Sequence, residues 1–130
     1  MASILVVDDE ESIREVLFRR LTTWGHQVGT ARTADEALTV MGSAPASIVF
    51  CDLIMPVHDG LWLMERVRER WPDTIVVVVS GSEDFAKVAQ TRKLGAVDYV
   101  TKPVGREMLH QALERALTEL ASRGGAGNSA

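Results

Sequence analysis

The sequence contains one cysteine in 130 residues, which excludes a disulfide framework and any zinc site built from several cysteines. Aromatic residues make up only 5% of the chain, so aliphatic side chains must fill most of its core. No apolar run approaches the ~20 residues that a membrane-spanning helix needs. The acidic stretch beginning at Asp8 has no basic flank before it, unlike a secretory signal. We therefore expect a cytoplasmic domain with no membrane contact.

Positive charge is also scarce, with 14 lysines and arginines against 18 aspartates and glutamates and a net charge of −4. Because phosphate backbones attract basic surfaces, we expect no direct binding of nucleic acid by these residues. The hydrophobic fraction of 46% and the charged fraction of 25% are ordinary for a globular protein. A length of 130 residues predicts one domain, able to bury about two thirds of its unfolded surface.

Short aliphatic runs rich in β-branched residues recur along the chain and predict strands. These runs do not alternate with polar residues, which indicates strands that are covered on both faces of a parallel sheet. We expect strands within residues 4–7, 27–30, 47–51, 74–79 and 97–100.

Between these runs, apolar residues recur at spacings of three and four and predict amphipathic helices. Thr33 or Asp35 is suited to cap the second helix, and Asp59 precedes the third. Gly42 stands where the second helix is expected to end. The helical patterns lie within residues 13–21, 34–41, 61–68, 85–94 and 108–120.

This alternation of strands and helices predicts an α/β fold, a doubly wound parallel sheet of five strands with five helices. We place the domain at residues 1–121. Residues 122–130 are rich in glycine, alanine and serine, and their composition predicts a flexible tail or a truncated linker.

Polar side chains follow four of the expected strands. Doubly wound sheets bind ligands at the carboxyl ends of their strands, so these positions are the candidate site. Three carboxylates, one hydroxyl and one ammonium should meet there. They belong to Asp8, Asp9, Asp52, Ser80 and Lys102.

The chemistry of this set differs from that of common nucleotide sites. The sequence has neither G-x-G-x-x-G after its first strand nor a G-x-x-x-x-G-K-[ST] loop. Crowded carboxylates repel one another, and a hard cation such as Mg²⁺, or Mn²⁺ in its place, offsets that repulsion. One carboxylate could then attack a phosphoryl group, with the metal, the lysine and the hydroxyl neutralising its oxygens.

The ordered set of motifs resembles the receiver domain of two-component response regulators over about residues 3–121. With this resemblance we expect the flavodoxin-like strand order 2-1-3-4-5. The motifs are Asp8-Asp9, Asp52-x-x-Met55-Pro56, Asp59-Gly60, Ser80, Gly95-Ala96-x-Asp98-Tyr99 and Lys102-Pro103.

The resemblance implies a role for each acidic residue. Asp52 would be the phosphoacceptor and would take its phosphoryl group from the phosphohistidine of a histidine kinase or from a small phosphodonor. Asp9, Asp52 and the backbone carbonyl of Ile54 would bind Mg²⁺ directly, and Asp8 would act through a metal-bound water. Ile54 and Ser82 stand at positions that tune the phosphoryl lifetime, and the bulky Ile54 predicts slow to moderate self-dephosphorylation.

The resemblance also implies a conformational switch. Ser80, in place of the commoner threonine, would donate a hydrogen bond to the phosphoryl group, and Lys102 would pair with it. Tyr99 would change rotamer with Ser80, which biases an equilibrium between two forms. The bond between Lys102 and Pro103 would be cis, which an X-Pro bond tolerates at low cost.

Two other functions remain open at this stage. A Mg²⁺-dependent phosphotransferase or phosphatase would need a capping insertion and a second aspartate two residues after the nucleophile, where Ile54 stands instead. A protein-binding module independent of phosphorylation would be favoured by the loss of site residues, and none is lost. The receiver interpretation predicts a signalling domain rather than a turnover enzyme. Its partners would be a histidine kinase or phosphotransfer domain and, through the fourth helix, fifth strand and fifth helix, an output domain, a partner protein or a second copy.

Overall fold

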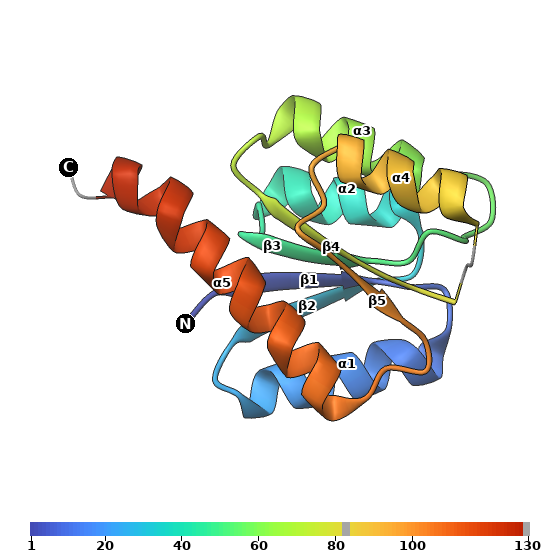
Figure 1. The fold of residues 1–130 in the computed structure, drawn as a ribbon, viewed down its shortest axis with the longest axis horizontal. Coiled ribbons are helices and arrows are strands. Elements are labelled where there is room, and N and C mark those ends of the chain that lie inside the picture. Colours follow the sequence, from blue (N-terminus) through green and yellow to red (C-terminus); the bar gives the residue numbers. More distant parts are fainter. Residues whose placement is uncertain (82–83, 129–130) are drawn as a thin grey trace.

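A parallel sheet of five strands in the order β2-β1-β3-β4-β5 runs through the centre of the molecule (Figure 1). The chain is seen in a computed structural model that describes residues 1–81 and 84–128. The sheet and its strand order confirm the fold expected from the sequence. The strands are β1 (Ser3–Val7), β2 (Gln27–Ala31), β3 (Ile48–Cys51), β4 (Ile75–Ser80) and β5 (Asp98–Thr101).

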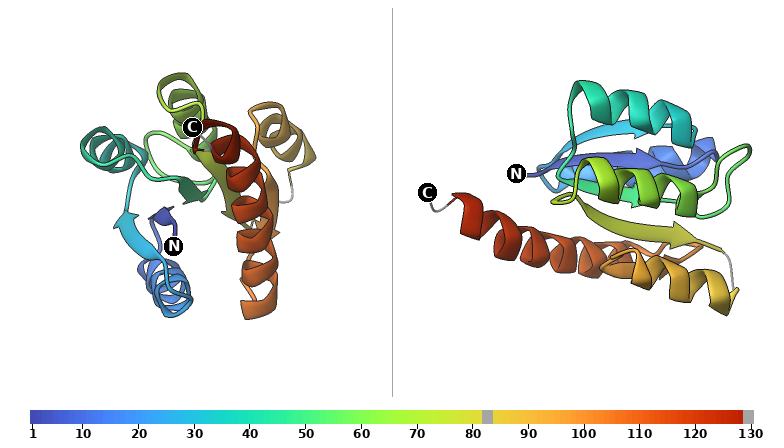
Figure 2. Two further views of the ribbon diagram at one scale, coloured as in Figure 1. Left: turned by 90° about the vertical axis from the view of Figure 1, so that its left-hand side faces the viewer. Right: turned by 90° about the horizontal axis from the view of Figure 1, so that it is seen from above.

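Helices cover both faces of this sheet: α1 and α5 lie on one face, and α2, α3 and α4 lie on the other (Figures 1 and 2). Successive residues of β1 point to opposite faces of the sheet. Ile4 and Val6 pack under α1 and α5, and Leu5 and Val7 face the other three helices. This explains the unbroken apolar runs. The helices are α1 (Glu11–Thr23), α2 (Ala34–Ser43), α3 (Gly60–Arg70), α4 (Phe85–Lys93) and α5 (Arg106–Asn128).

Side-chain caps define where three of the helices begin. Thr33 caps α2 by accepting the backbone N–H of Glu36, and Asp59 caps α3 by accepting that of Trp62. Asp84 caps α4 in the same way. Of the two residues predicted for α2, Thr33 is therefore the cap. The helix ends at Ser43, one residue beyond the end expected at Gly42.

The last helix is longer than its apolar pattern predicts. α5 continues to Asn128, and its C-terminal part extends beyond the end of the sheet (Figure 2). The boundary predicted at Ala121 therefore falls within this helix, which includes residues 122–128. Ser129 and Ala130 lie outside the described residues. None of the helices described combines the length and apolar character required to cross a bilayer.

Candidate functional site

The carboxyl ends of β1, β3, β4 and β5 surround one shallow pocket of about 450 Å³. The parallel sheet brings these ends to one edge, and so unites residues that are far apart in the sequence. The pocket is lined by Asp9, Glu10, Asp52, Ile54, Ser80, Gly81 and Lys102. Asp8 does not line this pocket, but its carboxylate contacts the ammonium of Lys102, which does. The structure thus brings together every residue predicted for the metal and phosphoryl chemistry.

Asp8 is the most deeply buried carboxylate of the site, with 1% of its surface exposed. Its Oδ1 accepts the backbone N–H of Glu10 at 2.9 Å, at the start of α1. Among the described residues its Oδ2 receives no hydrogen bond of good geometry, although the ammonium of Lys102 lies 2.9 Å away. Burial raises the pKa of the Asp8 carboxyl, and the nearby charge of Asp52 acts in the same direction. Burial of the Asp8 carboxylate is therefore unfavourable in the charged form, and a further positive charge nearby would stabilise that form.

Lys102 is the cation of this cluster. Its Nζ lies 2.9 Å from Oδ2 of Asp8, 2.9 Å from Oε1 of Glu10 and 3.2 Å from Oδ2 of Asp52. Burial alone would lower its pKa, but the close carboxylates of Asp8 and Glu10 and the charge of Asp52 raise the pKa above its ordinary value. Lys102 is therefore a permanent positive charge at neutral pH. Its peptide bond to Pro103 is cis.

Asp52 follows β3 directly and is 3% exposed. Its Oδ1 accepts the backbone N–H of Ile54 at 3.2 Å, which leaves Oδ2 directed to Lys102. The start of α3 packs tightly behind it, because a Cβ at Gly60 would overlap the Asp52 carbonyl and lie 2.8 Å from Cα of Leu53. A side chain of any size at position 60 would displace the loop that holds the carboxylate.

The residues of the site fit a hard divalent cation. Asp8, Asp9, Glu10 and Asp52 can each offer one oxygen, and these oxygens lie within 4.8 Å of one another. The buried Asp8 Oδ2 needs a positive partner, and Lys102 brings one charge against four carboxylates. Oxygen donors of this kind are the ligands that Mg²⁺ prefers, and it commonly uses one or two carboxylates with several waters.

Ser80 and Tyr99 lie on the same face of the sheet. Ser80 ends β4 and is fully buried, and Tyr99 pairs in register with Val78, two residues before Ser80. Tyr99 does not line the acidic pocket. It borders a second pocket of about 350 Å³ formed by α4 and β5, whose lining includes Val88 and Thr91. The described structure thus offers space beside Tyr99 on the side of α4.

Sequence reasoning did not find two features of the site. Glu10 is not among the residues predicted for the site, yet its carboxylate contacts the ammonium of Lys102. His58, in the loop after Asp52, is likewise absent from the sequence prediction, yet its ring stacks on that of Trp62 with centroids 3.7 Å apart and its Nδ1 lies 3.2 Å from Oδ2 of Asp35. The place of Glu10 directly after Asp9 was an available signal. The other lifetime-tuning position, Ser82, lies outside the described residues.

Known proteins share both this fold and this sequence pattern. A family model described as the response regulator receiver domain matches residues 4–114. The receiver domain of NtrX from Brucella abortus is 34% identical with a TM-score of 0.84, and the match covers 88% of this chain and 98% of that one. For the chemotaxis protein CheY4 of Vibrio cholerae the identity is 30%, the TM-score 0.84 and the coverage 89% and 98%.

Among curated relatives, the DNA-binding transcriptional regulator NtrC of Azospirillum brasilense is 32% identical over 89% of this chain. The match covers only 24% of NtrC, and the chain spans less than half the length of the first curated relatives that it matches. The family match covers most of the chain and coincides with the sheet that builds the acidic pocket. The chain therefore belongs to the receiver domains of two-component response regulators.

Proposed function

We propose that Asp52 accepts a phosphoryl group from the phosphohistidine of a histidine kinase or phosphotransfer domain. An Asp52 oxygen forms the new bond to phosphorus while the P–N bond to the histidine breaks and the imidazole leaves. The observation that carries the proposal is the buried Asp52 carboxylate, whose Oδ2 lies 3.2 Å from the Lys102 ammonium at the rim of an acidic pocket. Lys102 is placed to neutralise an oxygen of the transferred group, and Ser80 borders the same pocket.

The proposed cofactor is Mg²⁺, with Mn²⁺ as a substitute. Asp9, Asp52 and the backbone carbonyl of Ile54 would bind it, and Asp8 would hold it through a water. When bound, the metal offsets the repulsion among the carboxylates and polarises the phosphoryl oxygens. The support for this set is the cluster of oxygens within 4.8 Å and the raised pKa of Asp8, which burial causes.

Phosphorylation is proposed to switch the domain through Ser80 and Tyr99. A phosphoryl group on Asp52 would draw the Ser80 hydroxyl toward it and free space for Tyr99 to turn inward. The shared face of the two residues and the pocket between α4 and β5 support this coupling. The α4-β5-α5 surface is the proposed contact for an output domain, a partner protein or a second copy, and the cytoplasm is the proposed compartment.

Phosphorylation and dephosphorylation are proposed to be self-catalysed to a limited extent. Ile54 is 51% exposed at the rim of the pocket, where its apolar side chain hinders an attacking water. We expect a phosphoryl lifetime longer than a few seconds. Decay of the phosphorylated form after removal of the phosphodonor measures it, and complete loss within seconds would contradict this part of the proposal.

An intact-mass measurement tests the central step. With acetyl phosphate and Mg²⁺ the protein should gain about 80 Da, one phosphoryl group, and EDTA should prevent the gain. Asp52→Asn should abolish the adduct. Asp59→Asn is the matched control, because it changes another aspartate of the same loop while asparagine still caps α3. If neither acetyl phosphate nor phosphoramidate gives an adduct on the wild-type protein, the proposed function is wrong.

A further inference from the structure

Three carboxylates surround the ammonium of Lys102. Asp8 and Glu10 each place an oxygen 2.9 Å from Nζ, and Asp52 places one at 3.2 Å. An ammonium has three N–H groups. Lys102 is therefore surrounded by carboxylates before any phosphoryl group arrives, and a phosphoryl oxygen has to compete with these partners for the ammonium.

The three partners differ in how easily they can leave. The Asp8 side chain is 1% exposed, so separating it from Lys102 would leave a buried charge without a partner. The Asp52 side chain is 4% exposed and is itself the group that receives the phosphoryl group, so it stays within the site. The side chain of Glu10 is 57% exposed and can return to water at little cost. Its backbone stays in place, because the Glu10 N–H donates to Asp8.

The local structure also explains why Glu10 is free to take this position. Glu10 is the N-cap residue of α1, but its side chain forms no capping hydrogen bond with the described helix. Asp8 accepts the N–H of Glu10 instead, and the Glu10 carboxylate reaches across to the end of β5. The side chain at the N-cap position of α1 therefore contacts the lysine of the site instead of capping the helix.

We propose that Glu10 is a positioning residue that occupies Lys102 in the resting domain and competes with the phosphoryl group for it. This inference rests on the proposed function, since it assumes that Lys102 pairs with a group on Asp52. Glu10 would set how much phosphodonor the domain needs for half-maximal reaction, and its release to water would accompany phosphorylation.

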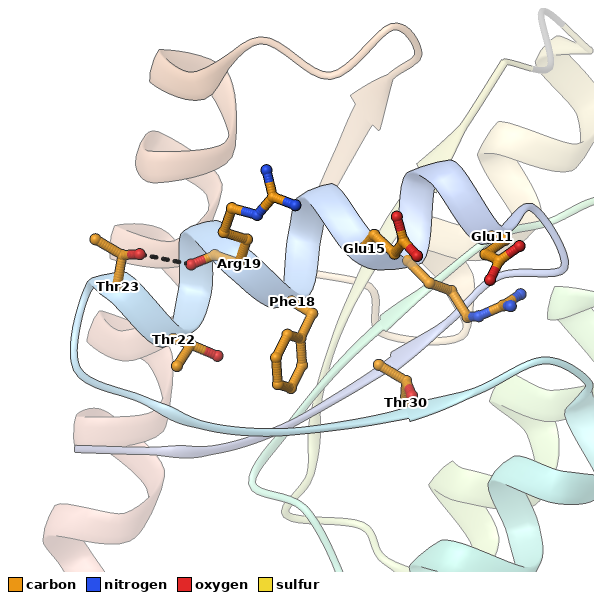
Figure 3. A pocket seen from close by; sticks show the side chains of 8 residues that line it. Glu11, Glu15, Phe18, Arg19, Thr22, Thr23 and Thr30 are labelled. Atoms are coloured by element: carbon orange, nitrogen blue, oxygen red, sulfur yellow. Dashed lines mark hydrogen bonds between the residues drawn. The ribbon is translucent and has the colours of Figure 1, made fainter.

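Glu10→Gln tests the proposal, with Glu11→Gln as the matched control. Both variants remove one negative charge from adjacent residues, but Glu11 lines a different pocket along α1 and has no contact with Lys102 among those described (Figure 3). Two quantities are measured at a saturating Mg²⁺ concentration, and a separate Mg²⁺ titration of each variant determines that concentration. They are the phosphodonor concentration for half-maximal phosphorylation and the equilibrium affinity for beryllofluoride, a phosphoryl analogue.

The expected result for Glu10→Gln is a decrease of about 1.5- to fivefold in the half-maximal phosphodonor concentration and in the dissociation constant for beryllofluoride, the range for one exposed ion pair. Glu11→Gln should stay close to wild type, and added salt should narrow the gap between wild type and Glu10→Gln by screening the pair. If Glu10→Gln and Glu11→Gln behave alike while wild type forms a normal adduct, the inference is wrong and the proposed function stands. If the wild-type protein forms no adduct, both are wrong.

Discussion

The ammonium nitrogen of Lys102 lies 3.2 Å from Oδ2 of Asp52, although 50 positions of sequence separate the two residues. The same nitrogen also contacts Asp8, so one cation joins the ends of β1, β3 and β5. Without a metal this cation compensates two buried carboxylates only partly, as the raised pKa of Asp8 indicates. The site is therefore built for binding at a cost to the stability of the metal-free domain.

Asp8→Asn should stabilise the metal-free protein. Burial raises the pKa of Asp8 above its unfolded value, so the charged form opposes folding above the folded-state pKa, and this penalty disappears below the unfolded-state pKa. We expect a gain on the order of 1–2 kcal/mol near neutral pH in EDTA, since neutral replacements of crowded buried charges often stabilise. Thermal unfolding in EDTA and in Mg²⁺ checks this.

The stabilisation that Mg²⁺ gives the wild-type protein should shrink in Asp8→Asn. Asp73→Asn, an exposed aspartate beyond the opposite end of the sheet, is the control and should keep both stabilities unchanged. A loss of stability in EDTA for Asp8→Asn would show that the Asp8 charge is a net stabilising partner of Lys102.

Gly60→Ala should destabilise the domain by about 1–3 kcal/mol, the usual cost of overpacking. The added Cβ would overlap the Asp52 carbonyl and press on Leu53, so phosphorylation of Asp52 should slow as well. Urea unfolding and the rate of adduct formation measure the two effects.

Gly42→Ala provides the matched control for this substitution. Gly42 lies inside α2, where an added Cβ would meet no described atom within 4 Å beyond the adjacent helix backbone, so alanine should stabilise by about 0.5–1 kcal/mol through helix propensity. Equal effects at the two glycines would contradict the close packing of α3 against the Asp52 loop.

The fold was predictable because its signals are local and repeated. Runs such as Ile4–Val7 are buried on both faces, and polar residues of the site stand directly after four of the five runs, so strand ends and site residues could be placed together. The length of α5 was not predictable from its glycine-rich composition. Composition is a weak guide to helix length, and an i,i+4 pair between Arg123 and Glu119, at 3.0 Å, lies across the predicted boundary.

Side-chain geometry in loops was beyond the reach of sequence patterns. The stacking of His58 on Trp62 depends on the backbone of the loop before it, where Val57 has a φ of 71°. The Glu10 carboxylate contacts Lys102 while Asp8 accepts the backbone N–H of Glu10, the N-cap residue of α1. Neither the His58–Trp62 stacking nor the Glu10–Lys102 contact produces a periodic pattern in the sequence, so residue types alone did not predict them.

His26 should make the domain less stable in mild acid. Its Nδ1 accepts the backbone N–H of Ala2 at 3.0 Å, which requires the unprotonated nitrogen. Burial lowers the pKa of His26, the N-terminal charge lowers it further, and Glu114 opposes both. The unfolded chain therefore binds the proton first, and stability falls as pH drops from about 6.5, the unfolded value, to the folded-state pKa.

His26→Asn should remove this part of the pH dependence, because the amide oxygen of asparagine still accepts a hydrogen bond but does not titrate. We expect the free energy of unfolding of wild type to fall by about 0.5–1 kcal/mol more than that of the variant between pH 7.5 and 5.5. Urea unfolding at the two values measures it. His110→Asn, an exposed histidine on α5, serves as the control and should retain the wild-type pH dependence from His26. An identical decrease in wild type and His26→Asn would show that protonation of His26 is not linked to folding.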